Sequence, residues 1–461
     1  MSSMTLLEEA VTTAGTVTPL IPKAIDPVLL EYQRRYSPML AAIPTKQWNS
    51  TQYFFNRRVN RPDSGAVIDG GARPISNSTY EQSVYNIRLF QAVGSVTGFA
   101  QTVTRDIVGD LRQLELDGTV QSMLWTVENS FIWGNDPATT NGVQPMCSGL
   151  DYLVSNYTAG TGSNAFVNAQ DVNGSITLAK LDELIDLVES NAAMPIDGSP
   201  WMFLMSGRMV SAVSQLFVNQ QRFMAPTTNL GGGLNVPSYR GVPMVKSSFL
   251  SPRSFQMGAV TTGTATTGGT LAATTYYYQV SAVVARFGEI AASTEVSQTT
   301  TGSTSTVTLS FATPTGLPDN AAPILYKVYR STATTTETLV GVVDAFDTTG
   351  VAVTSITDTG TNLLTNSAGN TGPAAYVGTN AGAKPRPVPA ANTFNAYEDI
   401  YLLSMDPNFL VRPYTRNMQI LPLAPTVTAP DTLPFAVLTD TTLALRAPKY
   451  AGRLSRVVAN I

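Results

Sequence analysis

The sequence has 461 residues, of which only 13% are charged, with one cysteine, no histidine and a net charge of −4. Ordinary soluble domains carry about 25% charged residues, so this composition favours a surface that is largely buried against other copies of the chain. A threonine- and serine-rich surface kept wet by its hydroxyl groups is the alternative. The charge balance gives no basic stripe for nucleic acid, and one cysteine allows no intrachain disulfide.

The N-terminus, MSSMTLLEEAVTTAG, has neither the basic region nor the apolar region of a secretory signal. No window approaches the eighteen consecutive apolar residues that a membrane-spanning helix requires. We therefore expect a soluble protein that is made in a cytoplasm and does not enter a membrane.

Residues 1–50 contain short apolar patches that five prolines interrupt, so we expect an arm that drapes over another surface. In residues 51–103, Tyr85, Ile87 and Leu89 alternate with polar neighbours, as in a half-buried strand. The middle of this segment, 60–74, is rich in turn-forming residues. The pattern predicts a long hairpin with a flexible tip, which needs a partner surface because an isolated hairpin is marginally stable in water.

Residues 102–136 carry apolar side chains at three- and four-residue steps, which predicts one long helix. Thr104 is the expected N-cap, Asp106 suits the first turn, and Gly134 is expected to end the helix. Gly109 and Gly118 each weaken it by up to about 1 kcal/mol relative to alanine, so packing must stabilise it.

Two further amphipathic helices are predicted over 175–192 and 206–224, the second capped by Ser206. Strand-like stretches follow the first helix and the second, at 201–205 and 241–248. This mixture predicts an α+β core. Helical periodicity returns at 395–413, and the chain ends in strand-like sequence over 435–461.

Residues 257–382 differ from the rest, with 31 threonines in 126 residues, three basic residues and seven acidic ones. This segment therefore carries the whole net charge of −4. Its long strand-like runs predict an all-β sandwich inserted into a surface loop, where it would leave the host fold intact. One alternating set of side chains is expected to face the inside of the sandwich: Tyr276, Tyr278, Val280, Ala282 and Val284.

No catalytic motif emerges from the chain. Without histidine, the usual general base and the commonest metal ligand are missing. The Gly-rich NLGGGLN at 229–235 lacks the Lys-Ser/Thr of a phosphate-binding loop. The sequence predicts a protein that is not an enzyme and has no cofactor, metal or catalytic residue.

The order of these elements, together with ENSFIWGND (128–136) and the final TTLALRAPKYAGRLSRVVANI, resembles a major capsid protein of tailed bacteriophages with the Hong Kong 97-type shell fold. The likeness covers residues 1–256 and 383–461. The resemblance implies an α+β Hong Kong 97-like fold in five parts: an N-terminal arm (1–50), an extended loop (51–103), a spine helix with the peripheral domain and the start of the axial domain (104–256), an inserted sandwich (257–382), and a return to the axial and peripheral domains (383–461).

The inserted segment resembles an immunoglobulin or fibronectin type III module, on the stretches TYYYQVSAVVARFGEIAAS, YKVYRS and TSITDTG. Shell proteins of this family often carry an inserted domain on the outer surface. The resemblance therefore implies that this sandwich lies outside the shell.

The resemblance also implies the partners: copies of the chain in hexamers and pentamers of an icosahedral head, a portal, decoration proteins, and double-stranded DNA enclosed without sequence-specific binding. The protein would be part of the virion and would assemble in the host bacterial cytoplasm. Some relatives carry a long, charged scaffolding segment ahead of the arm. This sequence starts almost at the arm, so either a separate scaffolding protein exists or the segment was cleaved; the initiator Met1 favours a separate scaffolding protein, which we expect.

Some relatives weld their subunits through a lysine on the extended loop, but residues 51–103 contain no lysine. We therefore expect no such crosslink from this loop. Instead, we hypothesise that four arginines on the loop contact carboxylates of the adjoining subunit: Arg57, Arg58, Arg61 and Arg73. Solvated arginines on a polar hairpin are the alternative.

Two other classes stay open from the sequence. A secreted or surface adhesin, or carbohydrate-binding protein, would use the sandwich as its working part, but it usually has a secretion signal and repeated modules. An encapsulin-type compartment shell would share the fold. The sequence does not reveal the shell size or the ligand of the sandwich.

Overall fold

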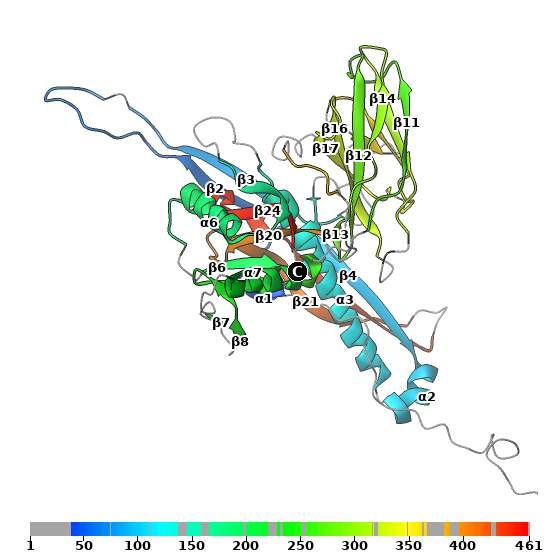
Figure 1. Ribbon diagram of the computed structural model, residues 1–461. Coiled ribbons are helices and arrows are strands. Elements are labelled where there is room, and N and C mark those ends of the chain that lie inside the picture. The colour runs from blue at the N-terminus through cyan, green and yellow to red at the C-terminus, as the bar shows by residue number, and fades with distance from the viewer. Residues whose placement is uncertain are drawn as a thin grey trace, which may run out of the picture.

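The computed structural model describes residues 38–459, apart from positions 74, 109, 137–144, 158–165, 197–199, 220–227, 231–233, 251–254, 316, 318–320, 348, 362–363, 367–381, 388–395 and 426–429. A body of two sheets and several helices carries a long hairpin that projects from one side, and a separate β-sandwich stands beside the body (Figure 1). Most of the predicted arm, residues 1–37, lies outside the described residues.

The centre of the body is a mixed six-stranded sheet with the order β5-β24-β20-β6-β10-β9. Helices α6 and α7 cover one face, where Leu184 and Val213 pack with Phe203 in one apolar core. Ser206 caps α7 as predicted, because its Oγ accepts a hydrogen bond from Met209 N at 3.1 Å. The elements are β5 (Ala169–Ser175), α6 (Leu178–Ala192), β6 (Trp201–Met205), α7 (Gly207–Asn219), β9 (Ser238–Tyr239), β10 (Val242–Lys246), β20 (Tyr397–Ser404) and β24 (Ala451–Val458).

The helical periodicity predicted at 395–413 is wrong, because the segment forms strand β20 instead. β20 is a central strand between β24 and β6, and apolar cores bury both of its faces. Ile400 and Leu402 belong to the core under α6 and α7, whereas Tyr401 and Leu403 belong to the core on the other face. A strand that is apolar on both sides loses the period-two pattern, so its sequence resembles a buried helix.

The long helix predicted over 102–136 is two helices, α2 (Gly98–Val108) and α3 (Leu111–Trp133). The N-cap of the main helix is Asp110, whose carboxylate accepts a hydrogen bond from Gln113 N. The predicted cap, Thr104, lies inside α2 and bonds back to Ala100 O. A strong aspartate cap beside Gly109 favours a break there over one continuous rod. Gly134 is the C-cap, as predicted.

A second sheet, with the order β1-β21-β22-β4 and β23 beside β21, extends from the body along α3. α3 packs on β4 and β22, and Val127 and Phe131 meet Phe90 and Val437 in the same core. The strands are β1 (Thr45–Gln47), β4 (Arg88–Thr97), β21 (Leu410–Pro422), β22 (Thr432–Thr441) and β23 (Ala444–Leu445).

The projecting hairpin consists of β2 (Gln52–Asn60) and β3 (Thr79–Asn86), paired antiparallel. The predicted alternation of Tyr85, Ile87 and Leu89 does not hold through the segment, since Ile87 is buried but Leu89 is 72% exposed. Ile87 lies between two strands of different sheets, because β4 leaves the hairpin and pairs with β22. The change of sheet resets which side chains point inward.

The sandwich has one sheet of the order β11-β15-β18-β19 and another of the order β13-β12-β16-β17, with β14 beside β12. The predicted inner set is confirmed, because all five side chains lie in the core between the sheets: Tyr276, Tyr278, Val280, Ala282 and Val284. The strands are β11 (Val260–Ala265), β12 (Thr275–Val284), β13 (Gly288–Glu289), β14 (Val296–Thr299), β15 (Thr306–Phe311), β16 (Pro323–Ser331), β17 (Thr338–Asp344), β18 (Ser355–Asp358) and β19 (Leu364–Asn366).

Short elements complete the described part of the chain. They connect the sheets or cover their edges: α1 (Pro38–Ala42), α5 (Leu150–Leu153), β7 (Thr228–Leu230), β8 (Leu234–Val236), η2 (Ser248–Leu250) and η4 (Pro448–Tyr450).

Candidate functional site

The hairpin carries all four arginines that the sequence singled out, but it does not bring them together. Arg57 lies on β2 and donates to Glu81 of β3 through Nε and Nη2, at 3.1 and 2.9 Å. Arg58, on the other face of the strand, lies over the ring of Tyr80 at 5.8 Å. Both pairs stabilise the hairpin within one subunit.

The other two arginines lie at the tip. Arg73 is 3.7 Å from Asp63, an exposed and therefore weak ion pair. Arg61 is exposed and has no ion pair among the described residues. Arg57 and Arg73 thus already have carboxylate partners inside the chain. Whether an adjoining subunit also contacts any of the four stays a prediction.

The base of the hairpin is fastened to the body by polar contacts around Asp136. Asn86 donates to one carboxylate oxygen of Asp136 at 2.8 Å, and Arg88 forms an ion pair with the other. The phenol of Tyr85 donates to Leu445 O at 3.0 Å. The glycine-acid stretch 134–136, which contributed to the family resemblance, therefore anchors the root of the projecting hairpin.

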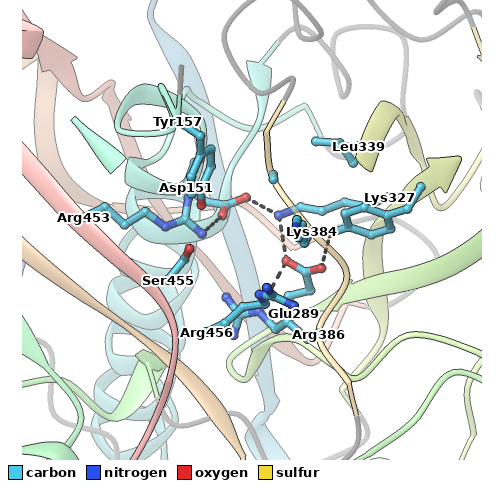
Figure 2. A pocket seen from close by; sticks show the side chains of 12 residues that line it. Asp151, Tyr157, Glu289, Lys327, Leu339, Lys384, Arg386, Arg453, Ser455 and Arg456 are labelled. Carbon is cyan, nitrogen blue, oxygen red and sulfur yellow. Dashed lines mark hydrogen bonds and ion pairs between the residues drawn. The ribbon is translucent and has the colours of Figure 1, made fainter. Parts of the chain in front are cut away.

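A buried group of charges joins the sandwich to the body, and we call it the joint cluster (Figure 2 shows its members except Asp399). Three cations and three carboxylates alternate in it, each between 0% and 5% exposed: Asp151, Glu289, Lys327, Arg386, Asp399 and Arg453. Glu289 and Lys327 come from the sandwich, whereas Asp151, Asp399 and Arg453 come from α5, β20 and β24. Arg386 lies on the segment that returns from the sandwich to the body.

Every cation of the joint cluster bridges two carboxylates. Lys327 Nζ lies 2.7 Å from Asp151 and 2.9 Å from Glu289. Arg386 lies 2.5 Å from Asp399 and 3.5 Å from Glu289. Arg453 lies 2.8 Å from both Asp151 and Asp399. With equal numbers of opposite charges, the cluster is neutral as a whole, which a buried group of ions requires.

The protonation states in the joint cluster follow from this pairing. Burial alone would raise the pKa of Asp151, but the charges of Lys327 and Arg453 outweigh it and hold that pKa well below its usual range. The same balance, with Lys327 and Arg386 as the cations, lowers the pKa of Glu289. Asp151 and Glu289 are therefore ionised near neutral pH, and their ion pairs hold the sandwich to the body.

A second contact seats the sandwich on α3, through the turn between β12 and β13. The backbone N–H of Arg286 donates to Asn129 Oδ1 at 2.8 Å, and its guanidinium lies 5.5 Å from the ring of Trp125. Gly288 has a φ of +87°, and a Cβ there would lie 2.2 Å from the indole of Trp133. The turn fits against α3 only because residue 288 is glycine.

Sequence reasoning did not find the joint cluster, because its members are far apart in the chain and no motif links them. One signal was present. Lys327 stands between Tyr326 and Val328 in an apolar strand, on the face opposite to the side chains that fill the sandwich. A lysine in such a place requires a buried partner, and therefore indicates a surface that covers this face.

The described part of the chain holds no group of three or more His, Cys, Asp or Glu side chains that could bind a metal ion. Among the same residues, no helix is long and apolar enough to cross a membrane. The single cysteine, Cys147, is fully buried, and burial raises the pKa of its thiol to about 12.

A mixed α+β body with a long helix beside a sheet and a projecting hairpin is the fold of a capsid-shell subunit. The capsid of cyanophage A-1(L) is similar with a TM-score of 0.50 and 10% identity, over 97% of this chain and 99% of that one. The capsid of a native GTA particle has a TM-score of 0.47 and 9% identity, over 98% and 100%. A structure of Mycobacterium phage Ogopogo is similar with a TM-score of 0.47 and 8% identity, over 97% of this chain and 99% of that one.

The model of the SU10 major capsid protein family matches residues 10–240. The chain belongs to this family and is a major capsid protein of a bacteriophage. A search of curated proteins returned no match. The family match favours the capsid prediction over the adhesin and the encapsulin-type compartment shell.

Proposed function

We propose that this protein assembles with copies of itself into hexamers and pentamers, which close an icosahedral phage head around double-stranded DNA. Membership of a major capsid protein family carries this proposal. In support, the hairpin projects away from the body and leaves apolar side chains in water, including Phe54 at 39% and Val84 at 44% exposed. An isolated hairpin of this kind gains stability only from another surface.

The domains of the shell fold can be assigned in the same terms. The six-stranded sheet with α6 and α7 corresponds to the axial domain, and α3 with the second sheet corresponds to the peripheral domain. The hairpin corresponds to the extended loop. A separate scaffolding protein, a portal and decoration proteins would be the partners, and assembly would take place in the bacterial cytoplasm before the protein becomes part of the virion.

The sandwich would stand on the outer surface of the head as an immunoglobulin-like module. In support, the chain crosses between its two sheets from β14 to β15, from β15 to β16 and from β17 to β18. Such crossings are typical of immunoglobulin-like sandwiches. The joint cluster and the turn on α3 hold it at two places, so we expect a rigid part of the subunit that moves little relative to the shell.

Negative-stain electron microscopy of the recombinant full-length chain, with light scattering after size exclusion, tests the assembly. Closed shells, or rings of five or six subunits with knobs on their outside, are the expected result. Co-expression with a scaffolding protein from the same phage is the second arm. Monomers in both arms would contradict self-assembly, and knobs on the inside would contradict the outer placement of the sandwich.

The four loop arginines are proposed to contact carboxylates of the adjoining subunit. Arg58 and Arg61 are the sharpest test, because neither has a carboxylate partner among the described residues. Changing each to glutamate should reduce the yield of assembled particles, whereas Lys180→Glu on exposed helix α6 should not. Normal particle yield from both arginine variants would remove the claim.

A further inference from the structure

A groove lies where the base of the hairpin meets the segment around η4, and we call it the basal groove. Its volume is about 350 Å³, within the range of ligand pockets. The lining comes from both sides: Arg57, Arg58, Val59 and Glu81 of the hairpin, Phe166, and residues 446–450. Arg57 and Arg58, which are proposed above to contact the adjoining subunit, lie on the hairpin side of this groove.

Positive charge exceeds negative charge in the basal groove by three, since Arg57, Arg58, Arg446 and Lys449 face only Glu81. Arg57 already binds Glu81. Arg446 lies over the ring of Phe55 at 5.7 Å, and Lys449 lies over Phe166 at 5.6 Å. In the described part of the chain, neither of them nor Arg58 has a carboxylate within ion-pair distance. Cations gathered in this way attract an anion.

The rest of the lining is apolar and firmly held. Tyr450 stacks on Phe409 with ring centroids 3.7 Å apart, and Phe166, Pro448 and Val59 complete the wall. Apolar surface beside three cations suits a peptide segment in which a carboxylate follows apolar side chains, because one segment then satisfies both parts of the groove.

The tip of the hairpin presents such a segment. Val67 is 56% exposed and Ile68 is 83% exposed, and the exposed carboxylate of Asp69 follows them. A tight turn holds the three in place, with a hydrogen bond from Gly71 N to Ile68 O at 2.8 Å and a φ of +74° at Gly70. Among the described residues, Asp69 has no ion pair.

The tip cannot fill the groove of its own chain, because the hairpin is extended and carries its tip away from the body (Figure 1). From Arg58 to Asp69 the chain advances 11 residues, or up to about 36 Å at the rise of a strand. The occupant must therefore come from a second copy. A reach of this length is of the order of the width of one subunit of this size.

We propose that the tip segment Val67–Asp69 of one subunit docks into the basal groove of the next, with Asp69 on the free cations and the two apolar side chains against the aromatic wall. The contact is head-to-tail, so repetition generates a ring or a row of subunits. The proposal rests on the proposed self-assembly and names the surface that receives the hairpin tip.

Engineered cysteines test the contact directly, because the native Cys147 is fully buried. Ala66→Cys beside the tip segment and Ala447→Cys in the groove leave the tip segment and the groove cations in place. Assembled particles of the double variant, oxidised and run without reductant, should give a ladder of covalent multimers. Each single variant, and the pair Ala66→Cys with Thr261→Cys on the sandwich, should stay monomeric. Particles of the double variant that give no ladder would overturn the proposal.

A peptide measurement separates this contact from self-assembly as a whole. A cyclic peptide of residues 61–78 should bind the unassembled full chain, and Lys449→Glu in the chain should weaken binding at least about tenfold. Asp69→Asn in the peptide should weaken it similarly, whereas Asp63→Asn, which affects the contact to Arg73 within the tip, should not. If the peptide does not bind, or binds equally to the Lys449→Glu chain, the groove does not receive the tip.

Discussion

Replacing Lys327 by methionine tests the joint cluster, and its cost can be estimated from the contacts. Lys327 is 5% exposed and neutralises Asp151 at 2.7 Å and Glu289 at 2.9 Å. Without it, two cations face three buried carboxylates. Removing one partner of a buried ion pair costs about 3–5 kcal/mol, because an uncompensated charge stays in the interior. We expect a loss of this size in the free energy of unfolding.

Urea titration of the unassembled chain, followed by tryptophan fluorescence, measures this loss, since Trp125 and Trp133 lie where the sandwich meets α3. The matched control is Lys180→Met, whose ion pair with Glu183 is about as short, at 2.6 Å, but roughly half-exposed. It should cost less than about 1 kcal/mol. Adding Glu289→Gln to Lys327→Met restores charge balance and should recover part of the loss. Equal stability of the two lysine variants would refute the role of the cluster.

Three further predictions concern other parts of the molecule. Gly288→Ala should lower the free energy of unfolding by about 2–5 kcal/mol, because of its positive φ and the collision with Trp133. Gly118→Ala, with open space around it on α3, should raise the free energy of unfolding by up to about 1 kcal/mol in the same titration. Burial raises the pKa of Glu128 to about 7, although its carboxylate accepts hydrogen bonds from Met39 N and Leu40 N. The fold therefore favours the protonated side chain of Glu128. The contribution of this side chain to the free energy of unfolding is complete below about pH 4.5 and is lost as the pH rises to about 7. Glu128→Gln should therefore flatten this part of the pH–stability profile, by about 1–3 kcal/mol, and an unchanged profile would contradict it. Wild-type particles boiled in SDS should run as monomers, because the hairpin has no lysine, and a covalent ladder would be the opposite result.

The sequence predicted those elements whose patterns reflect local rules. Ser206 caps α7 because a side-chain oxygen satisfies a free backbone N–H at any helix start. Tyr276, Tyr278 and Val280 face the inside of the sandwich because that strand has a clear period of two. The projecting hairpin followed from apolar strands on both sides of a polar, Gly-rich turn.

Elements that depend on distant neighbours were predicted less well. The sequence of β20 has a helical pattern because apolar cores bury both of its faces, and the sequence does not show which elements form those cores. The helix predicted from Thr104 begins at Asp110, since two competing caps stand only six positions apart and packing decides between them. The joint cluster escaped prediction entirely, because Asp151 and Lys327 meet only after folding.

The sandwich is less independent of the body than an insertion into a surface loop would be. Val283, Leu325 and Tyr329 of the sandwich share one apolar core with Phe131 and Trp133 of α3. Deleting the sandwich would therefore expose part of the main core of the body and leave Asp151 without Lys327.

The shared core and the neutral buried cluster also fix the sandwich to several elements of the body. The sandwich touches α3 through its β12–β13 turn, it reaches α5 through Lys327 and Asp151, and it reaches β20 through Arg386 and Asp399. β20 belongs to the six-stranded sheet and α3 packs on the second sheet, so the sandwich is fixed to elements on both sides and opposes movement of one sheet against the other. Buried ion pairs cost several kcal/mol to separate, which fits a subunit that keeps one core geometry and leaves adjustment between neighbours to its projecting hairpin.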